Sequence, residues 1–347
     1  MAGARVPLTM IKQQEELLSS LVGNITGVAC NFSVHLSLKL LRSLSGPKNN
    51  KEAMFAFPGL MDSIGICSTH MYEAVREEAA RIIMNLSMST KNQAHIVQGN
   101  NQRLIDVVLV LARGSGASNL YAIKAFGYLA SLPENKIIIV KHKKGAVINE
   151  LLRVASSGIT QSQVSTIATR ILATLTCQAT AVELERHPGL LLTVSSLACR
   201  DDKPPTLPLA AALTIKKIST HVFSSQVCQA LVTMSYARTT EVLKYTVKAY
   251  CEQVSNEEGR VKMIAQRGLL AALTMVANDN NGFVQFHAQE VLGSLAADVA
   301  NAKNVPVEKV LRCVSASKVV CQNRGTLQPR CYSPSSIAQF DFDFAAF

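Results

Sequence analysis

Four cationic side chains recur along the chain at nearly constant spacing. Lys39, Arg81, Lys124 and Arg170 follow one another at steps of 42, 43 and 46 residues. Positions on the same face of successive stacked helices would lie about 10 Å apart, roughly one helix diameter. Arg and Lys form charge-assisted hydrogen bonds with carboxylates. The row therefore predicts recognition of an extended acidic segment, and the alternative is that long side chains only solvate an exposed helix face.

Patterns typical of catalysis or metal binding are missing from the sequence. The seven histidines are isolated, with no HxH, HExxH or Cys/His spacing, so neither a metal site nor a cofactor is expected. The Gly-rich segment 113–118 lacks the Lys-Ser/Thr of a P-loop, and GxSxG does not occur. The basic run 141–144 is more typical of a solvated loop between helices than of a phosphate site. We expect a protein that is not an enzyme.

The four cations belong to a longer repeat. An apolar run ends at an anchor residue, followed in most cases by Leu or Ile, and the anchors are Ser43, Asn85, Tyr128, Thr174, Lys217, Gln253 and Ser294. Their steps are 42, 43, 46, 43, 36 and 41 residues. A period of this length is typical of stacked helical repeats, which bind partners along an extended surface. The short step predicts a truncated helix, or a shifted register, between 217 and 253.

A second landmark keeps the same phase. A small or turn-forming residue precedes five of the anchors by 26 to 29 residues, and these residues are Gly59, Asn101, Gly145, Gly189 and Gly268. Between the landmarks apolar residues are spaced three and four apart, which predicts helices such as one over about 161–176. Gly127, Ala173 and Gly293 are expected to let neighbouring helices approach closely.

The composition narrows the class of protein and of partner. Of 347 residues, 48% are hydrophobic but only 5% are aromatic and none is Trp, so the core must be aliphatic. The net charge of +11 favours anionic partners, which are acidic protein segments, nucleic acid or anionic lipid. Nine cysteines without a framework indicate reduced thiols in the cytoplasm or nucleus. The sequence shows no secretion signal and no apolar stretch long enough to span a bilayer.

The repeat resembles the armadillo repeat over roughly residues 15 to 317. The best match is 75–87, VREEAARIIMNLS, with an acidic-basic start, Ala-rich packing and an Asn-Leu-Ser end. The chain resembles an armadillo-repeat protein that has diverged from importin-α-like and β-catenin-like members. This resemblance implies an all-α fold, a right-handed superhelical solenoid (α-α superhelix) of about seven armadillo-like repeats. HEAT repeats are the close rival.

The resemblance also suggests a domain organisation. Residues 1–45 are expected to form an N-terminal cap and incomplete first repeat, with 17–24 as the last helix of an incomplete repeat. Residues 46–317 are expected to form the armadillo-like repeats, and 318–347 a poorly ordered tail.

A binding groove follows from the same resemblance. In armadillo proteins the third helix of each repeat lines a concave groove, and importin-α-like members carry a Trp four residues before an Asn to grip basic peptides. In this chain the Trp position holds Lys39, Arg81, Lys124, Arg170, Leu213, Ala249 and Glu290. Cations there disfavour basic cargo, whereas β-catenin-like members use a basic groove for acidic partners. Asn85 holds the Asn position and is expected to hydrogen-bond a partner backbone.

The C-terminal tail has a different pattern. Phe and Asp alternate strictly at Phe340, Asp341, Phe342, Asp343 and Phe344. An extended segment would place the rings on one side and the carboxylates on the other. The tip is either a frayed end or a motif that docks into a basic groove, its own or that of a neighbouring copy.

Two hypotheses of different class follow. The first is a non-enzymatic scaffold or adaptor that binds extended, acidic protein segments in a basic concave groove, in the cytoplasm or nucleus. The second is a nucleic-acid or anionic-membrane-surface binding protein that uses the same basic face, although scarce aromatics argue against single-stranded nucleic acid. A regulatory subunit or a fragment of a larger solenoid is a third reading.

Overall fold

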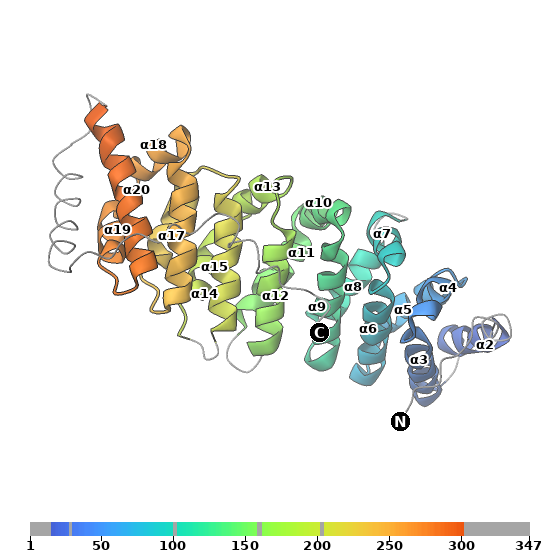
Figure 1. Ribbon diagram of the computed structural model, residues 1–347. Helices are drawn as coiled ribbons and strands as arrows, with labels where there is room; N and C mark the ends of the chain where they lie inside the picture. Colours follow the sequence, from blue (N-terminus) through green and yellow to red (C-terminus); the bar gives the residue numbers. More distant parts are fainter. Residues whose placement is uncertain (1–14, 28–29, 100–102, 158–161, 202–204, 302–347) are drawn as a thin grey trace. The chain divides into compact units, whose positions relative to one another are not determined.

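The structure, a computed structural model, describes residues 15–27, 30–99, 103–157, 162–201 and 205–301 (Figure 1). Every regular element in these ranges is a helix, which confirms the all-α prediction. None of these helices combines the length and the apolar character that crossing a bilayer requires. The chain divides into two compact units between Leu175 and Thr176.

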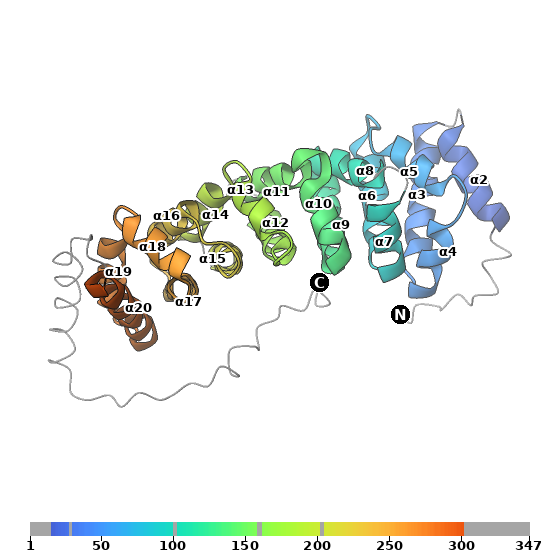
Figure 2. The same ribbon diagram turned by 90° about the horizontal axis from the view of Figure 1, so that it is seen from above.

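The first unit is built from helices of three kinds, which follow one another as first, second and third helix of a repeat. The third helices contact one another in series and are α3 (Asn31–Ser45), α6 (Glu73–Ser87), α9 (Gly116–Ser131) and α12 (Ser162–Leu175). The second helices form another series: α2 (Glu15–Thr26), α5 (Leu60–Cys67), α8 (Arg103–Arg113) and α11 (Ala146–Ser156). The first helices are shorter: α4 (Lys51–Phe55), α7 (Thr90–Gln98) and α10 (Pro133–Lys141). Figure 2 shows α9 and α12 on the opposite side of this unit from α8 and α11.

The N-terminal helix has a different place from the one predicted. Helix α2 contacts α3 and the second helix α5, so it is the second helix of the first repeat. The prediction that 17–24 is the last helix of an incomplete repeat is therefore wrong, because no glycine landmark fixes the phase in this part of the sequence.

The second unit repeats the arrangement in three repeats, one of which lacks a first helix. Its third helices are α15 (Thr206–Ser219), α17 (Thr240–Val254) and α20 (Gly282–Asn301). Its second helices are α14 (Leu190–Ala198), α16 (Ser225–Met234) and α19 (Leu269–Ala277). First helices precede two of them: α13 (Ala181–Arg186) and α18 (Glu257–Ala265). Figure 2 shows α15 and α17 on one side of this unit and α14 and α16 on the other.

The short repeat, which contains α16 and α17, lacks a first helix. Only residues 220–224 separate α15 from α16, and none of these is helical. The short step predicted a truncated helix or a shifted register, and the structure shows that the first helix of this repeat is absent.

The landmark glycines open second helices in a left-handed conformation. The φ angles are 77° at Gly59, 86° at Gly145, 77° at Gly189 and 82° at Gly268. These residues are the N-caps of α5, α11, α14 and α19. A side chain at such a φ costs about 1–2 kcal/mol, so the backbone itself selects glycine here. Asn101, the fifth landmark, lies outside the described residues.

The core is aliphatic, as the composition predicted. Val147, Ile148 and Leu151 on α11 are completely buried, as are Ile171 and Leu172 on α12. Helix α12 runs over 162–175, within one residue of the prediction at each end. The prediction for Gly293 is wrong, because this glycine is exposed and no atom lies within 4 Å of the Cβ that a side chain would add.

A series of buried asparagines, which the sequence analysis missed, joins the repeats of the first unit. Asn50 Nδ2 donates to the carbonyl of Leu44 at 3.0 Å. Asn92 Nδ2 donates to the carbonyls of Leu86 (3.1 Å) and Lys51 (3.0 Å), and Asn135 Nδ2 donates to those of Leu129 and Gln93 (both 3.1 Å). Each asparagine thus satisfies a carbonyl at the C-terminal end of a third helix, where no further helical N–H is available. Asn92 and Asn135 also hold the preceding first helix.

In the short repeat a glutamine from the third helix takes over part of this task. Gln253 is completely buried, and its Nε2 donates to the carbonyls of Ser219 (2.7 Å) and Val222 (2.9 Å). The helix that elsewhere would supply an asparagine is missing, so α17 itself satisfies the end of α15.

Candidate partner-binding surface

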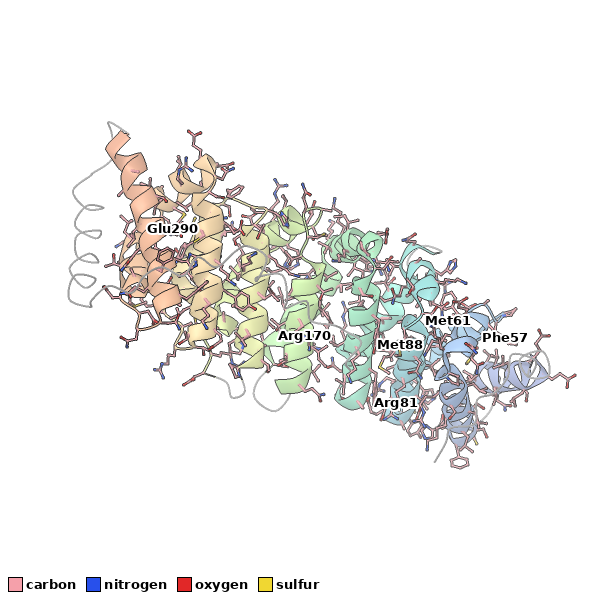
Figure 3. All side chains as sticks on the ribbon, in the orientation of Figure 1. Phe57, Met61, Arg81, Met88, Arg170 and Glu290 are labelled. Atoms are coloured by element: carbon pink, nitrogen blue, oxygen red, sulfur yellow. The ribbon has the colours of Figure 1, made fainter. Side chains whose placement is uncertain are left out.

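The four predicted cations occupy equivalent positions on consecutive third helices of the first unit. Lys39 on α3 is exposed, while Arg81 on α6, Lys124 on α9 and Arg170 on α12 are partly exposed. Figure 3 labels Arg81 and Arg170 on their helices. Because α3, α6, α9 and α12 contact one another in this order, the four residues form one row. We call this row the cation row.

Two contacts constrain Arg81 in the cation row. Its Nη2 lies 2.5 Å from Glu77 Oε1, one helical turn earlier, and its guanidinium lies 4.6 Å from the ring centroid of Tyr121 on the next third helix. The cation–π contact holds the guanidinium plane, while Glu77 offsets part of its charge. Arg81 therefore offers a fixed geometry, and Lys39 and Lys124 offer less restrained charge.

Arg170 is charged despite its partial burial. Burial lowers its pKa, but the ordinary pKa of arginine lies so far above neutrality that the group stays protonated at neutral pH. Its guanidinium thus keeps the charge that the cation row requires.

Asn85 uses its amide donor within the protein. Its Nδ2 donates to Ser45 Oγ of the preceding third helix at 2.9 Å, and its backbone carbonyl accepts from Lys51 Nζ at 2.9 Å. A contact between Asn85 and a partner backbone remains a prediction, and this geometry makes the amide oxygen Oδ1, an acceptor, the group for it.

In the second unit the predicted register is shifted by one residue in α17. Ala249, which the spacing placed at the outward position, is completely buried, and Lys248 lies at the partly exposed position beside it. The missing first helix moves the phase of the repeat, so the true anchor of α17 is Glu252 rather than Gln253. Leu213 is half-buried on α15, and Glu290 is exposed on α20 (Figure 3).

This shift reveals a cluster of lysines that sequence reasoning missed. Burial lowers the pKa of Lys248, and the charges of Lys216 and Lys244 lower it further. Lys248 Nζ also lies 5.6 Å from the ring centroid of Phe283 on α20. Glu252 Oε1, 3.6 Å from Lys216 Nζ, offsets part of this charge. Four-residue spacing of Lys244, Lys248 and Glu252 was the signal that could have found it.

The prediction of an inter-helix loop at the basic run 141–144 is wrong in part, because Lys141 is the last residue of α10 and His142–Lys144 form the 3-10 helix η3. The three lysines of the run are exposed, as expected for a solvated segment. His142 is buried, its Nε2 lies 2.9 Å from Asp106 Oδ1 on α8, and Lys143 Nζ lies 2.8 Å from the same oxygen. Partial burial alone would raise the pKa of Asp106, but hydrogen bonds from Lys143 and His142 outweigh it and lower the pKa. The run therefore ties α10 to α8.

The predicted tail motif, Phe340 to Phe344, lies outside the described residues. So does the predicted boundary of the repeats at residue 317.

Comparison with known proteins gives similarity of structure only. No family model matches the sequence, and no curated protein matches it. One engineered protein of known structure is 19% identical with a TM-score of 0.58, over 87% of this chain and 72% of its own. Another is 19% identical with a TM-score of 0.51, over 81% and 96%. A computationally designed armadillo repeat protein for modular peptide recognition is 16% identical with a TM-score of 0.46, over 80% and 99%.

At these identities the likeness concerns the fold. The three-helix repeats and their left-handed glycines show that the described part of the chain has an armadillo-like repeat fold, as predicted.

Proposed function

We propose that this protein is a non-enzymatic scaffold that binds an extended, acidic protein segment along its third helices. The observation that carries the proposal is the cation row. Its four residues take the same position on the four successive third helices of the first unit, and they are Lys39, Arg81, Lys124 and Arg170. A net charge of +11 adds a favourable long-range field for an acidic partner. We place the protein in the cytoplasm or nucleus, where its scattered thiols would stay reduced.

The spacing of the row constrains the partner. Packed helices lie about 8–10 Å apart, and an extended chain rises about 3.3 Å per residue. A matching segment therefore carries Asp or Glu two to three residues apart. Such a segment meets one cation per repeat without bending.

A fluorescence-anisotropy titration with two labelled peptides of equal composition tests the proposal. One peptide carries Glu at every third position, and in the other the same Glu residues are clustered at one end. The regular peptide should bind more tightly, and its affinity should fall as salt rises, because exposed charges are screened within about 8 Å at physiological ionic strength.

Matched charge-reversal variants distinguish the effect of the cation row on affinity from the effect of the protein's net charge. The double variant K39E/K124E should weaken binding at least about tenfold, which corresponds to about 1.4 kcal/mol. The control K48E/K91E changes the net charge equally at two exposed lysines outside the third helices. Equal losses in both variants, or no loss in the first, would contradict the proposal.

The same assay distinguishes this function from binding of nucleic acid or of an anionic membrane surface. A labelled oligonucleotide that binds more tightly than either peptide, with a steep salt dependence, would favour a nucleic-acid binder instead. Anionic vesicles are the third ligand in the assay, and tighter binding to them than to either peptide would favour a membrane-surface binder.

We further propose that the Phe-Asp tip, residues 340–344, competes for the cation row. Its carboxylates alternate with rings, so it has the charge of the proposed partner. Deleting residues 332–347 should raise the affinity for the regular peptide, and an unchanged affinity would dismiss the competition.

A further inference from the structure

Three chemically distinct metal-ligand groups meet between the last two third helices. Cys251 comes from α17, and His287 and Glu290 come from α20. One ligand atom of each, the Sγ, a ring nitrogen and a carboxylate oxygen, lies within 4.8 Å of the other two. Helices α17 and α20 are packed against each other within the second unit, so the backbone holds this grouping.

The distances suit a small four-coordinate ion. Zinc binds Cys sulfur at about 2.3 Å and His nitrogen or carboxylate oxygen at about 2.0–2.2 Å. These bond lengths place the ligands of a tetrahedral site about 3.5 Å from one another. His287 Nδ1 already lies 3.2 Å from Glu290 Oε2, and a bound ion would require Cys251 Sγ to move from within 4.8 Å to about 3.5 Å of these two atoms.

The surroundings hold the ligands and favour a cation. The His287 ring makes edge contacts with Phe283 and Phe286, with centroids 4.3 Å and 5.3 Å away, which restrict its rotation. A bound cation would take the place of the Cys251 thiol proton and would face the carboxylate of Glu290.

We propose that Cys251, His287 and Glu290 bind a divalent transition-metal ion, with Zn²⁺ the ion that suits this set of sulfur, nitrogen and oxygen ligands best. Three protein ligands leave one tetrahedral position, which a water or a carboxylate or imidazole of a partner fills. Motif spacing in the sequence does not reveal this site, because Cys251 lies far along the chain from His287 and Glu290. These ligands come from neighbouring repeats.

Cobalt titration of the full-length chain tests the site directly. Co²⁺ replaces Zn²⁺ in tetrahedral sites, and its thiolate complex absorbs in the near ultraviolet. One equivalent of Co²⁺ should produce this band, and added Zn²⁺ should abolish it. Cys251→Ser should eliminate the band. Losing a residue that only supports a ligand costs 10–100-fold in affinity, so His287→Gln and Glu290→Gln should each weaken binding at least about 100-fold.

Cys199→Ser is the matched control. Cys199 is partly exposed like Cys251, but its Sγ lies 3.2 Å from the carbonyl of Thr233 and it belongs to no ligand group among the described residues. This variant should keep the full band, and circular dichroism should show that every variant is folded. A band that survives Cys251→Ser, a band insensitive to both α20 variants, or no band at saturating Co²⁺ would overturn the proposal.

Discussion

Individual buried amides determine how one repeat of the first unit meets the next. Asn92 is 2% exposed and donates to two carbonyls, one at the end of its preceding third helix and one in the preceding first helix. Leaving a buried carbonyl without a donor costs about 1–3 kcal/mol. These residues therefore contribute to stability rather than to partner recognition.

Replacing Asn92 by Ala should lower the free energy of unfolding by about 2–3 kcal/mol, because two buried carbonyls lose their donor. Urea unfolding followed by circular dichroism measures the change. Asn149→Ala, at an exposed position of α11, is the control and should alter it by less than about 0.5 kcal/mol. Equal effects would mean that the buried hydrogen bonds contribute nothing specific.

The Asp106 cluster predicts a particular response to acid. The pKa of Asp106 is lowered in the folded chain from an ordinary value of 3.8, so the unfolded chain binds this proton more readily. The stabilisation is therefore complete above about pH 4 and is lost as the pH falls through the lowered pKa. Asp106→Asn should be less stable than wild type at pH 7, and the difference should shrink below pH 4. A difference in stability that is constant with pH would rule out the linkage.

Residue spacing predicted the cation row because Lys39, Arg81, Lys124 and Arg170 keep a constant phase over intact repeats. It failed at Lys248, because a missing helix shifted the phase by one residue. The asparagine series Asn50, Asn92 and Asn135 has the same steps, 42 and 43 residues, and was detectable in principle. Asparagine is more often a turn residue, and only the structure shows that these three are buried.

At the scale of single helices, the left-handed glycines determine where second helices begin. No heavy atom lies within 4 Å of the position that a Cβ on Gly189 would take, so an added methyl group meets no steric obstacle. The backbone φ of 77° at Gly189 is the only penalty. This isolates the conformational contribution from packing.

Gly189→Ala should therefore destabilise the protein by about 1–2 kcal/mol. Gly293→Ala is the opposite case, because Gly293 lies inside α20 with equally open space around its Cβ position. It should stabilise the protein by about 0.5–1 kcal/mol, since alanine is the better helix former. Thermal unfolding of both variants checks the prediction, and shifts of the same sign would contradict it.

The short repeat depends on one side chain of its third helix. Gln253→Met keeps the volume but removes the donor to the carbonyls of Ser219 and Val222. Cleavage by a protease within 220–224 should become faster, because the segment opens more often. Gln285→Met, at a partly exposed position of α20, should leave the cleavage rate unchanged. A rate unchanged by Gln253→Met would show that other contacts hold the segment.

At the scale of the whole molecule, repeats of this kind interact chiefly with their nearest neighbours, so local damage should spread over a limited distance. Leu86 on α6 and Leu273 on α19 are both completely buried, and replacing either by Ala costs about 2–5 kcal/mol. Leu86→Ala should accelerate hydrogen exchange in α3, α6 and α9, and Leu273→Ala in α17, α19 and α20. Each should leave the other group of helices close to wild type. Exchange that rises uniformly over both groups in either variant would instead show that the chain unfolds as one cooperative body, and the division at Leu175 would then have no energetic meaning.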